Sequence, residues 1–151
     1  MATRAIVRFA TREPGVSFSE HPDKWHAQFY VHRDGNVESL GLDIANSIAN
    51  RCFIPHNLEI DDLSCKRSDV YYCYYVWQHF DKSTWISIFR VNQSVECEHC
   101  DNYKDIPDEC IFVGEPMDLQ NKINSLGAYQ AFDAKSRAFD GNWNGEKITC
   151  L

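Results

Sequence analysis

The stretch that most constrains the fold is residues 70–78, VYYCYYVWQ, which are apolar or aromatic at almost every position. Side chains alternate between the two faces of a strand, so a strand with one face in water carries polar residues at every second position. This stretch does not, and it predicts a central strand covered on both sides, or a strand with one face presented to a partner. Residues 84–92, TWISIFRVN, are also rich in β-branched and aromatic residues, and the two stretches predict a hairpin across HFDKS.

Two earlier stretches alternate with the period of a half-buried strand. Residues 3–10, TRAIVRFA, and residues 25–32, WHAQFYVH, each place apolar side chains at every second position. The turn dipeptide Pro14-Gly15 lies between them, so they predict a second hairpin. Residues 110–114, CIFVG, predict one more short strand.

After Gly35 the apolar residues follow the period of an α-helix instead. Asn36 is placed to cap the start of this helix, and Pro55 prevents its continuation. The apolar and small residues that fall on one side of this predicted helix are Val37, Leu40, Gly41, Ile44, Ala45, Ile48 and Ala49.

A second helix is predicted from Pro116, a residue that suits a first helical position, with Leu119 and Ile123 on its apolar face. Gly127 interrupts this helix before a third helical stretch. Two segments show no period: the acidic, cysteine-containing residues 93–109, which we expect to form a long loop, and the tail 140–151, which we expect to be irregular.

A chain of 151 residues is long enough to bury one hydrophobic core and too short for two. We therefore expect a single α+β domain over residues 1–151, with an antiparallel sheet of about four to five strands and two to three helices packed on it. Arg4 and Arg8 interrupt the N-terminal apolar run, so it lacks the apolar region of a signal peptide, and we expect a cytoplasmic protein.

The triplet His32-Arg33-Asp34 matches the catalytic triplet of protein kinases, in which the Asp accepts a hydroxyl proton and a later Asn binds magnesium. Here Asn36 falls at the wrong spacing, and the chain is too short for that fold. The residues suit a turn between a strand and a helix, with Gly35 at positive φ. An alternative keeps His32, Asp34 and Asn36 as binding residues for an anion or small ligand at the helix N-terminus.

This strand, the HRDG junction and a helix opening with Leu40-Gly41, followed by the aromatic strand and STWISI, resemble a recurrent group of small bacteriophage and prophage proteins. Those proteins share a His-x-Asp-Gly junction and a later pair of aromatic strands, and they commonly carry Tyr-Pro where this chain has Asn36-Val37. The resemblance implies a phage or prophage origin, and with it the cytoplasm of a bacterial host cell. It implies no catalytic residues.

Seven cysteines in a chain without an export signal indicate reduced thiols or metal ligands rather than a disulfide framework. Cys97 and Cys100 have the Cys-x-x-Cys spacing with which two thiolates bind one zinc ion. Cys110 is the candidate third ligand, and Cys73 or Cys150 the fourth. Free thiols in a loop, with no cofactor, are the simpler interpretation.

Negative charge is concentrated between Glu96 and Asp118, where eight acidic residues accompany one basic residue, Lys104. The chain as a whole has a net charge of −7, which argues against direct binding to nucleic acid. The simple interpretation is a solvated loop, and the sharper one is a surface that attracts a basic partner. The candidate partner-binding residues are Glu96, Glu98, Asp101, Asp105, Asp108 and Glu109.

The sequence shows no nucleophile with an evident base, so we do not expect an enzyme. The favoured function is a non-enzymatic, phage-type binding or inhibitory protein, such as an anti-CRISPR or anti-restriction factor, whose acidic surface engages a basic, nucleic-acid-binding host protein. The alternatives are a sequestering protein for a small ligand or nucleotide signal, and a zinc-stabilised regulatory module. No membrane partner is expected, and a homodimer stays open.

Overall fold

The computed structural model describes residues 3–50, 58–65, 70–91, 93–96, 103–106, 108–127 and 130–133, and for 93–96 and 103–106 it describes the backbone alone. Six strands form one sheet in the order β3-β2-β1-β4-β5-β8. Their bounds are β1 Ala5–Thr11, β2 Lys24–Val31, β3 Leu58–Asp61, β4 Tyr72–Gln78, β5 Thr84–Arg90 and β8 Glu109–Gly114. Strands β6, Gln93–Glu96, and β7, Tyr103–Ile106, form a second, two-stranded sheet.

The sheet is mixed, because β1 pairs with β4 in parallel while the other neighbours pair antiparallel. Both predicted hairpins, β1–β2 and β4–β5, are confirmed. The expected antiparallel sheet of four to five strands is wrong in strand number and in direction. Alternation reports which face of a strand is buried, and it carries no information about the direction of the neighbouring strand.

Strand β4 is central, as its composition predicted, with β1 on one side and β5 on the other. Every residue from Tyr72 to Trp77 is buried. Tyr72, Tyr74 and Val76 pack in the cluster that includes the helices, whereas Cys73, Tyr75 and Trp77 pack in a separate cluster on the opposite face. Burial of each large side chain stabilises the fold by about 2 kcal/mol, so this strand anchors both layers of the core.

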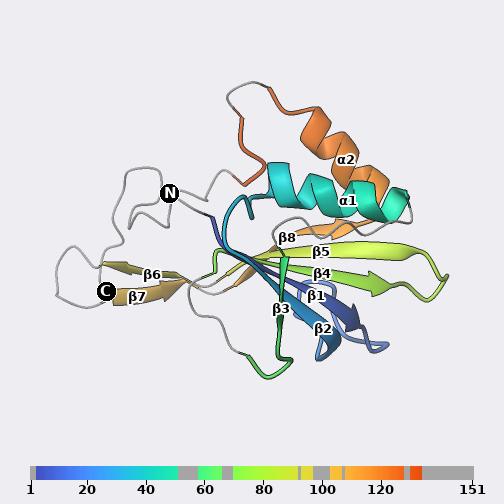
Figure 1. Ribbon diagram of the computed structural model, residues 1–151, viewed down its shortest axis with the longest axis horizontal. Helices are drawn as coiled ribbons and strands as arrows, with labels where there is room; N and C mark the ends of the chain where they lie inside the picture. The colour runs from blue at the N-terminus through green and yellow to red at the C-terminus, as the bar shows by residue number, and fades with distance from the viewer. Residues whose placement is uncertain are drawn as a thin grey trace.

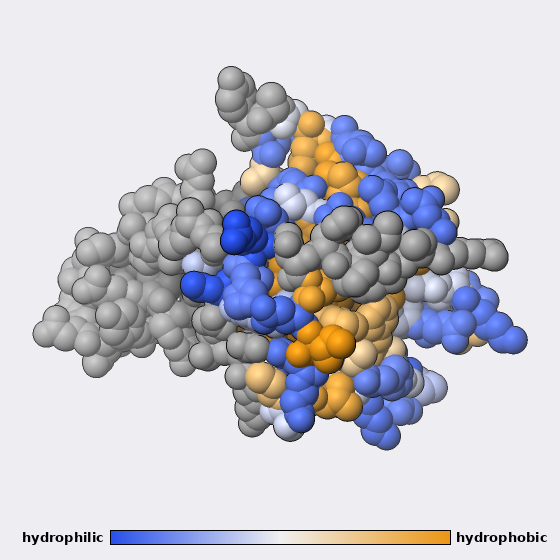
Figure 2. All heavy atoms as spheres, in the orientation of Figure 1, coloured by the Kyte–Doolittle hydropathy of each residue, from blue (hydrophilic) through white to orange (hydrophobic). Residues whose placement is uncertain are grey.

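Two helices, α1 and α2, lie side by side over one face of the sheet (Figure 1). A π-helical turn, Val37–Gly41, leads directly into α1, Leu42–Ala49. Asn36 occupies the expected position before the turn, but its side chain makes no capping hydrogen bond. Figure 2 shows hydrophobic residues gathered over the middle of the sheet, with hydrophilic residues at its edges.

Helix α2, Pro116–Asn124, begins with Pro116 at its first turn as predicted, and it buries Leu119 and Ile123 against the sheet. The predicted resumption after Gly127 is not helical at residues 130–133. The remainder of that stretch and the tail 140–151 lie outside the described residues. None of the helices in the described part of the chain is long and apolar enough to cross a membrane.

The expectation of a loop over residues 93–109 is wrong for the segments that the structure describes. Strands β6 and β7 pair antiparallel, with Glu96 opposite Tyr103 and Ser94 opposite Asp105. Strand β6 follows β5 in sequence and β7 precedes β8, and the two pair with each other in a sheet of their own. We call β6 and β7 the arm, and Figure 1 shows that it projects beyond the end of the six-stranded sheet.

Candidate functional sites

The HRD junction is a turn between β2 and the π-helical turn, but its backbone differs from the expected one. Asp34, not Gly35, has the positive φ, at 59°. Gly35 packs directly against β1: its N–H donates to Thr3 O at 2.9 Å, and a Cβ atom there would lie 2.7 Å from Ala5 Cβ. The Tyr74 hydroxyl donates to Gly35 O at 2.6 Å. Close approach of two backbones, rather than left-handed geometry, requires glycine at this position.

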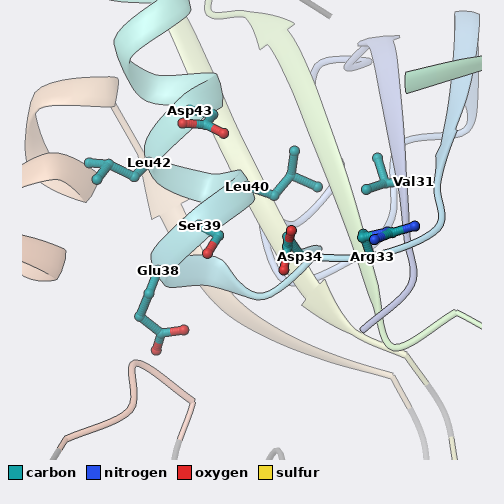
Figure 3. A pocket seen from close by; sticks show the side chains of 8 residues that line it. All are labelled: Val31, Arg33, Asp34, Glu38, Ser39, Leu40, Leu42 and Asp43. Carbon is teal, nitrogen blue, oxygen red and sulfur yellow. The ribbon is translucent and has the colours of Figure 1, made fainter. Parts of the chain in front are cut away.

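A pocket of about 280 Å³ opens beside this junction (Figure 3). Of the three predicted ligand-binding residues only Asp34 lines it. His32 Nε2 instead lies 2.9 Å from Glu59 Oε1 of β3, and Asn36 Nδ2 donates to Glu38 Oε2 at 3.0 Å.

The charge of this junction pocket does not suit an anion. Three carboxylates, those of Asp34, Glu38 and Asp43, line it with one guanidinium, that of Arg33. Free N–H groups and the helix dipole attract an anion to a helix N-terminus, but carboxylates beside it repel one. The predicted anion site at the helix start therefore finds no support in this geometry.

The acidic candidates differ in their surroundings. Asp108 accepts a hydrogen bond from His21 Nε2 at 2.7 Å, and Glu109 pairs with Arg90 of β5. Glu96 and Asp105 belong to the strands of the arm. Glu98 and Asp101 fall between those strands in sequence and lie outside the described residues. Two of the six predicted partner-binding acids are thus engaged within the molecule.

The zinc prediction rests mostly on residues outside the described part of the chain, since Cys97 and Cys100 both fall there. Cys110 lies on β8, where burial raises the pKa of its thiol and Sγ lies 3.5 Å from Phe112 O. Burial also raises the pKa of Cys73 to about 11, so this thiol stays protonated at neutral pH. Among the described residues, no three His, Cys, Asp or Glu side chains are grouped to hold a metal ion.

A polar network crosses the sheet face opposite the helices. Arg8 donates from Nε to Gln28 Oε1 and from Nη1 to Tyr75 Oη, each at 2.8 Å, and its guanidinium stacks 3.9 Å from the Trp25 ring. His21 Nδ1 lies 2.8 Å from Tyr75 Oη, and its ring stacks on Phe89 at 3.9 Å. These contacts join the β1–β2 loop to the sheet.

The tyrosine hydroxyl of this network is not activated for deprotonation. Burial raises the pKa of the Tyr75 hydroxyl well above its ordinary value, despite the neighbouring Arg8 charge. Gln28 is buried and donates onward to Asp61 Oδ2 and Cys65 O. The Arg8 guanidinium and the side chains around it hold one another in place across the sheet.

A larger pocket, of about 520 Å³, lies at the end of the sheet opposite the arm. One wall is the β1–β2 loop, with Arg12 and Phe18, and the other is the end of β4 with the β4–β5 turn, including Trp77, His79 and Phe80. We call it the aromatic pocket. Phe80 is 91% exposed and Phe18 46% exposed.

Sequence reasoning did not find the aromatic pocket. The available signal was Phe80 in the turn HFDKS, because turn tips favour small and polar residues and a large aromatic side chain there has no local role. The second wall comes from a loop more than fifty positions earlier in the chain, and no local pattern connects the two.

Comparison of the chain with models of protein families, with curated proteins and with solved structures finds no match.

Proposed function

We propose that the protein is a non-enzymatic binding protein that uses its acidic arm to engage a basic, nucleic-acid-binding host protein, in the manner of a phage anti-restriction or anti-CRISPR inhibitor. The observation that carries the proposal is the projection of the arm beyond the six-stranded sheet. A two-stranded ribbon of this kind is narrow enough to enter a groove that normally holds nucleic acid.

The charge of the arm, together with that of the residues between its two strands in sequence, fits such a groove. Residues 93–106 contain four acidic residues and one basic residue, Lys104. The acids are Glu96, Glu98, Asp101 and Asp105. Negative charge on a projecting element speeds encounter with a basic surface and rejects acidic ones.

The chemistry of the described residues also favours binding over catalysis. The pKa of Cys73 is raised to about 11 by burial, and burial raises that of Tyr75 as well, so neither side chain is an activated nucleophile. The histidine of the same network, His21, has both ring nitrogens within hydrogen-bond distance of protein groups.

Neutralising the arm tests the proposal. Asp108 is left unchanged because it bonds His21, and the substitutions are Glu96→Gln, Glu98→Gln, Asp101→Asn and Asp105→Asn. We expect association with the partner captured from a bacterial lysate to slow by about tenfold at low salt, because electrostatic steering is lost. The slowing should vanish toward 1 M salt, where the Debye length falls to about 3 Å. Surface plasmon resonance at several salt concentrations measures both effects.

The matched control changes the same number of charges at exposed acids of the main body: Asp23→Asn, Asp43→Asn, Glu115→Gln and Asp118→Asn. If this variant slows association as much as the arm variant does, net charge rather than the arm is responsible, and the proposal fails. Duplex DNA should compete with the unmodified protein for the partner. A complex that binds DNA and this protein together contradicts occupation of the groove.

A second candidate function, sequestration of a small ligand, is favoured by the aromatic pocket. Its volume of about 520 Å³ falls within the usual range for small-molecule sites. The sequence predicted a small-ligand site at the His32 to Asn36 junction. The aromatic pocket lies elsewhere, at the β4–β5 turn.

A further inference from the structure

The β4–β5 turn exposes more aromatic surface than its fold requires. Phe80 is 91% exposed, and its ring contacts His79 at 4.0 Å between centroids. The turn is stabilised independently of Phe80, because Asp81 Oδ1 accepts hydrogen bonds from Ser83 N and from Ser83 Oγ. Phe80 therefore contributes little to the folding of the turn, and its position at the rim of a pocket suggests a contact with a ligand.

The rings behind Phe80 form a continuous aromatic cluster, in which Phe18, Trp77 and His79 line the pocket. His79 stacks on Trp85 with centroids 4.4 Å apart and planes 15° apart, and Trp85 lies 5.5 Å from Trp77. Phe18, from the opposite loop, lies 5.7 Å from Trp77. Rings from two separate loops thus line one pocket, and aromatic faces of this kind favour a flat, stackable occupant.

The loop that carries Phe18 is fixed in place by Arg12. Its Nη1 donates to Ser17 O at 2.8 Å, and its Nη2 donates to Glu20 O at 2.6 Å and to Phe18 O at 3.2 Å. The guanidinium also lies 5.1 Å from the Trp77 ring centre. The wall of the pocket is therefore ordered before any ligand arrives, which lowers the entropy cost of binding.

Two buried nitrogen atoms of lining residues are incompletely hydrogen-bonded. Arg12 Nε finds none among the described residues, and His79 Nδ1 makes no hydrogen bond of normal geometry, although it lies 3.4 Å from Asp81 Oδ1. Arginine donates only, so its partner must be an acceptor, while the imidazole nitrogen donates or accepts according to tautomer. A ring that carries its own heteroatoms supplies such groups, and a hydrocarbon ring does not.

The charge of the residues that line the aromatic pocket indicates whether its ligand carries a phosphate group. The pocket is lined by one cation, Arg12, and one carboxylate, Glu13. The two terminal nitrogens of Arg12 already donate to loop carbonyls. The guanidinium is therefore not available for a bidentate pair of hydrogen bonds to a phosphate group. An uncharged planar ligand fits this balance better than an anion.

We propose that the aromatic pocket binds an uncharged, planar heteroaromatic ring of the nucleobase class, stacked on Phe80 and hydrogen-bonded to Arg12. The site is independent of the arm, since the two lie at opposite ends of the sheet. A base stacked on an aromatic side chain is the common mode by which proteins bind unpaired bases.

The indole N–H signals of Trp77, which lines the pocket, and of Trp85, which stacks on His79, report on this site. Both indoles are held in place, by Ser87 Oγ at 2.8 Å and Ser83 Oγ at 2.9 Å. The probes are adenosine, guanosine, cytidine and uridine, titrated into ¹⁵N-labelled protein. We expect at least one of them to shift both signals with a dissociation constant of about 1 mM or lower, and to leave the Trp25 signal unchanged. The corresponding nucleoside monophosphate should bind no more tightly.

The matched variants are Phe80→Ala and Ile60→Ala, which remove exposed side chains, 91% and 85% exposed, from the pocket rim and from β3. Phe80→Ala should weaken binding by about tenfold or more, and Ile60→Ala should not change it. Absence of any shift with all four nucleosides, or an unaltered affinity in Phe80→Ala, overturns the proposal. Tighter binding of p-cresol than of every nucleoside also overturns it, and assigns the pocket to an aromatic side chain of a protein.

Discussion

Replacing Gly35 by alanine is expected to lower the free energy of unfolding by about 3 kcal/mol, at the upper end of the cost of overpacking a core. The added Cβ would lie 2.7 Å from Ala5 Cβ and 2.9 Å from Thr3 O. Ala5 belongs to β1 and Thr3 O is a backbone atom shortly before it, so neither can rotate away as a long side chain would. Urea unfolding followed by tryptophan fluorescence measures the loss, which should appear as a lower midpoint with an unchanged slope.

Gly127→Ala is the matched control, because a Cβ there meets only ordinary contacts, at 3.5 Å and beyond from Gln130 atoms. Its effect should stay within about 0.5 kcal/mol. Equal stabilities for the two variants would mean that the junction is not packed against β1 as described. Gly15→Ala measures the cost of an unfavourable φ without crowding, since Gly15 has a φ of 88° but open space around it.

The second large effect is expected at a buried ion pair between β5 and the C-terminal part of the described chain. Arg90 and Asp133 have side chains 4% and 5% exposed, with Nη1 and Oδ1 2.8 Å apart, and the Tyr72 hydroxyl donates to Asp133 Oδ2 at 2.9 Å. Burial alone would lower the pKa of Arg90, but the hydrogen bonds and charges of Asp133 and Glu109 raise it overall, so the guanidinium stays charged.

Asp133→Ala should therefore lower the free energy of unfolding by about 3 kcal/mol, because it takes the carboxylate from a buried cation. Glu109→Gln should cost less, about 1 kcal/mol, since the Glu109 side chain is 53% exposed. The double variant Arg90→Met with Asp133→Leu should recover at least half of the loss. Thermal or urea unfolding measures the stability of the three variants. If Asp133→Ala and Glu109→Gln lower the free energy of unfolding equally, a buried pair centred on Asp133 is contradicted.

The strands that sequence reasoning found are those whose burial leaves a local pattern. Strand β4 is apolar on both faces because it lies at the centre of the sheet, and β1, β2 and β5 show enough alternation or β-branched content to be recognised. Strand β3 has only four residues, LEID, with Glu59 and Ile60 exposed, so it carries no such pattern. The parallel pairing of β1 with β4 depends on where the chain returns after α1 and β3, which no local window contains.

The sites were less predictable than the fold because they depend on contacts between distant segments. Gly35 was recognised as necessary, but for the wrong reason: its constraint is the position of Thr3 and Ala5, not its own φ. The acidic character of residues 96–118 was readable, whereas the pairing of Asp108 with His21, 87 positions away, was not. The aromatic pocket needs two loops to meet, and neither loop alone resembles a site.

We propose that the arm binds the partner and is not needed for the fold. Deleting residues 93–106 leaves a four-residue connection between Arg90 and Glu109, a length that hairpins accept, and it keeps Asp108 in place for His21. The decisive measurement is the affinity of this variant for the captured partner, with its unfolding free energy measured in parallel. We expect affinity to fall by about a hundredfold, equivalent to roughly 3 kcal/mol, while stability changes by less than about 1 kcal/mol. A stable deletion variant that binds the partner as tightly as the full chain would contradict the claim.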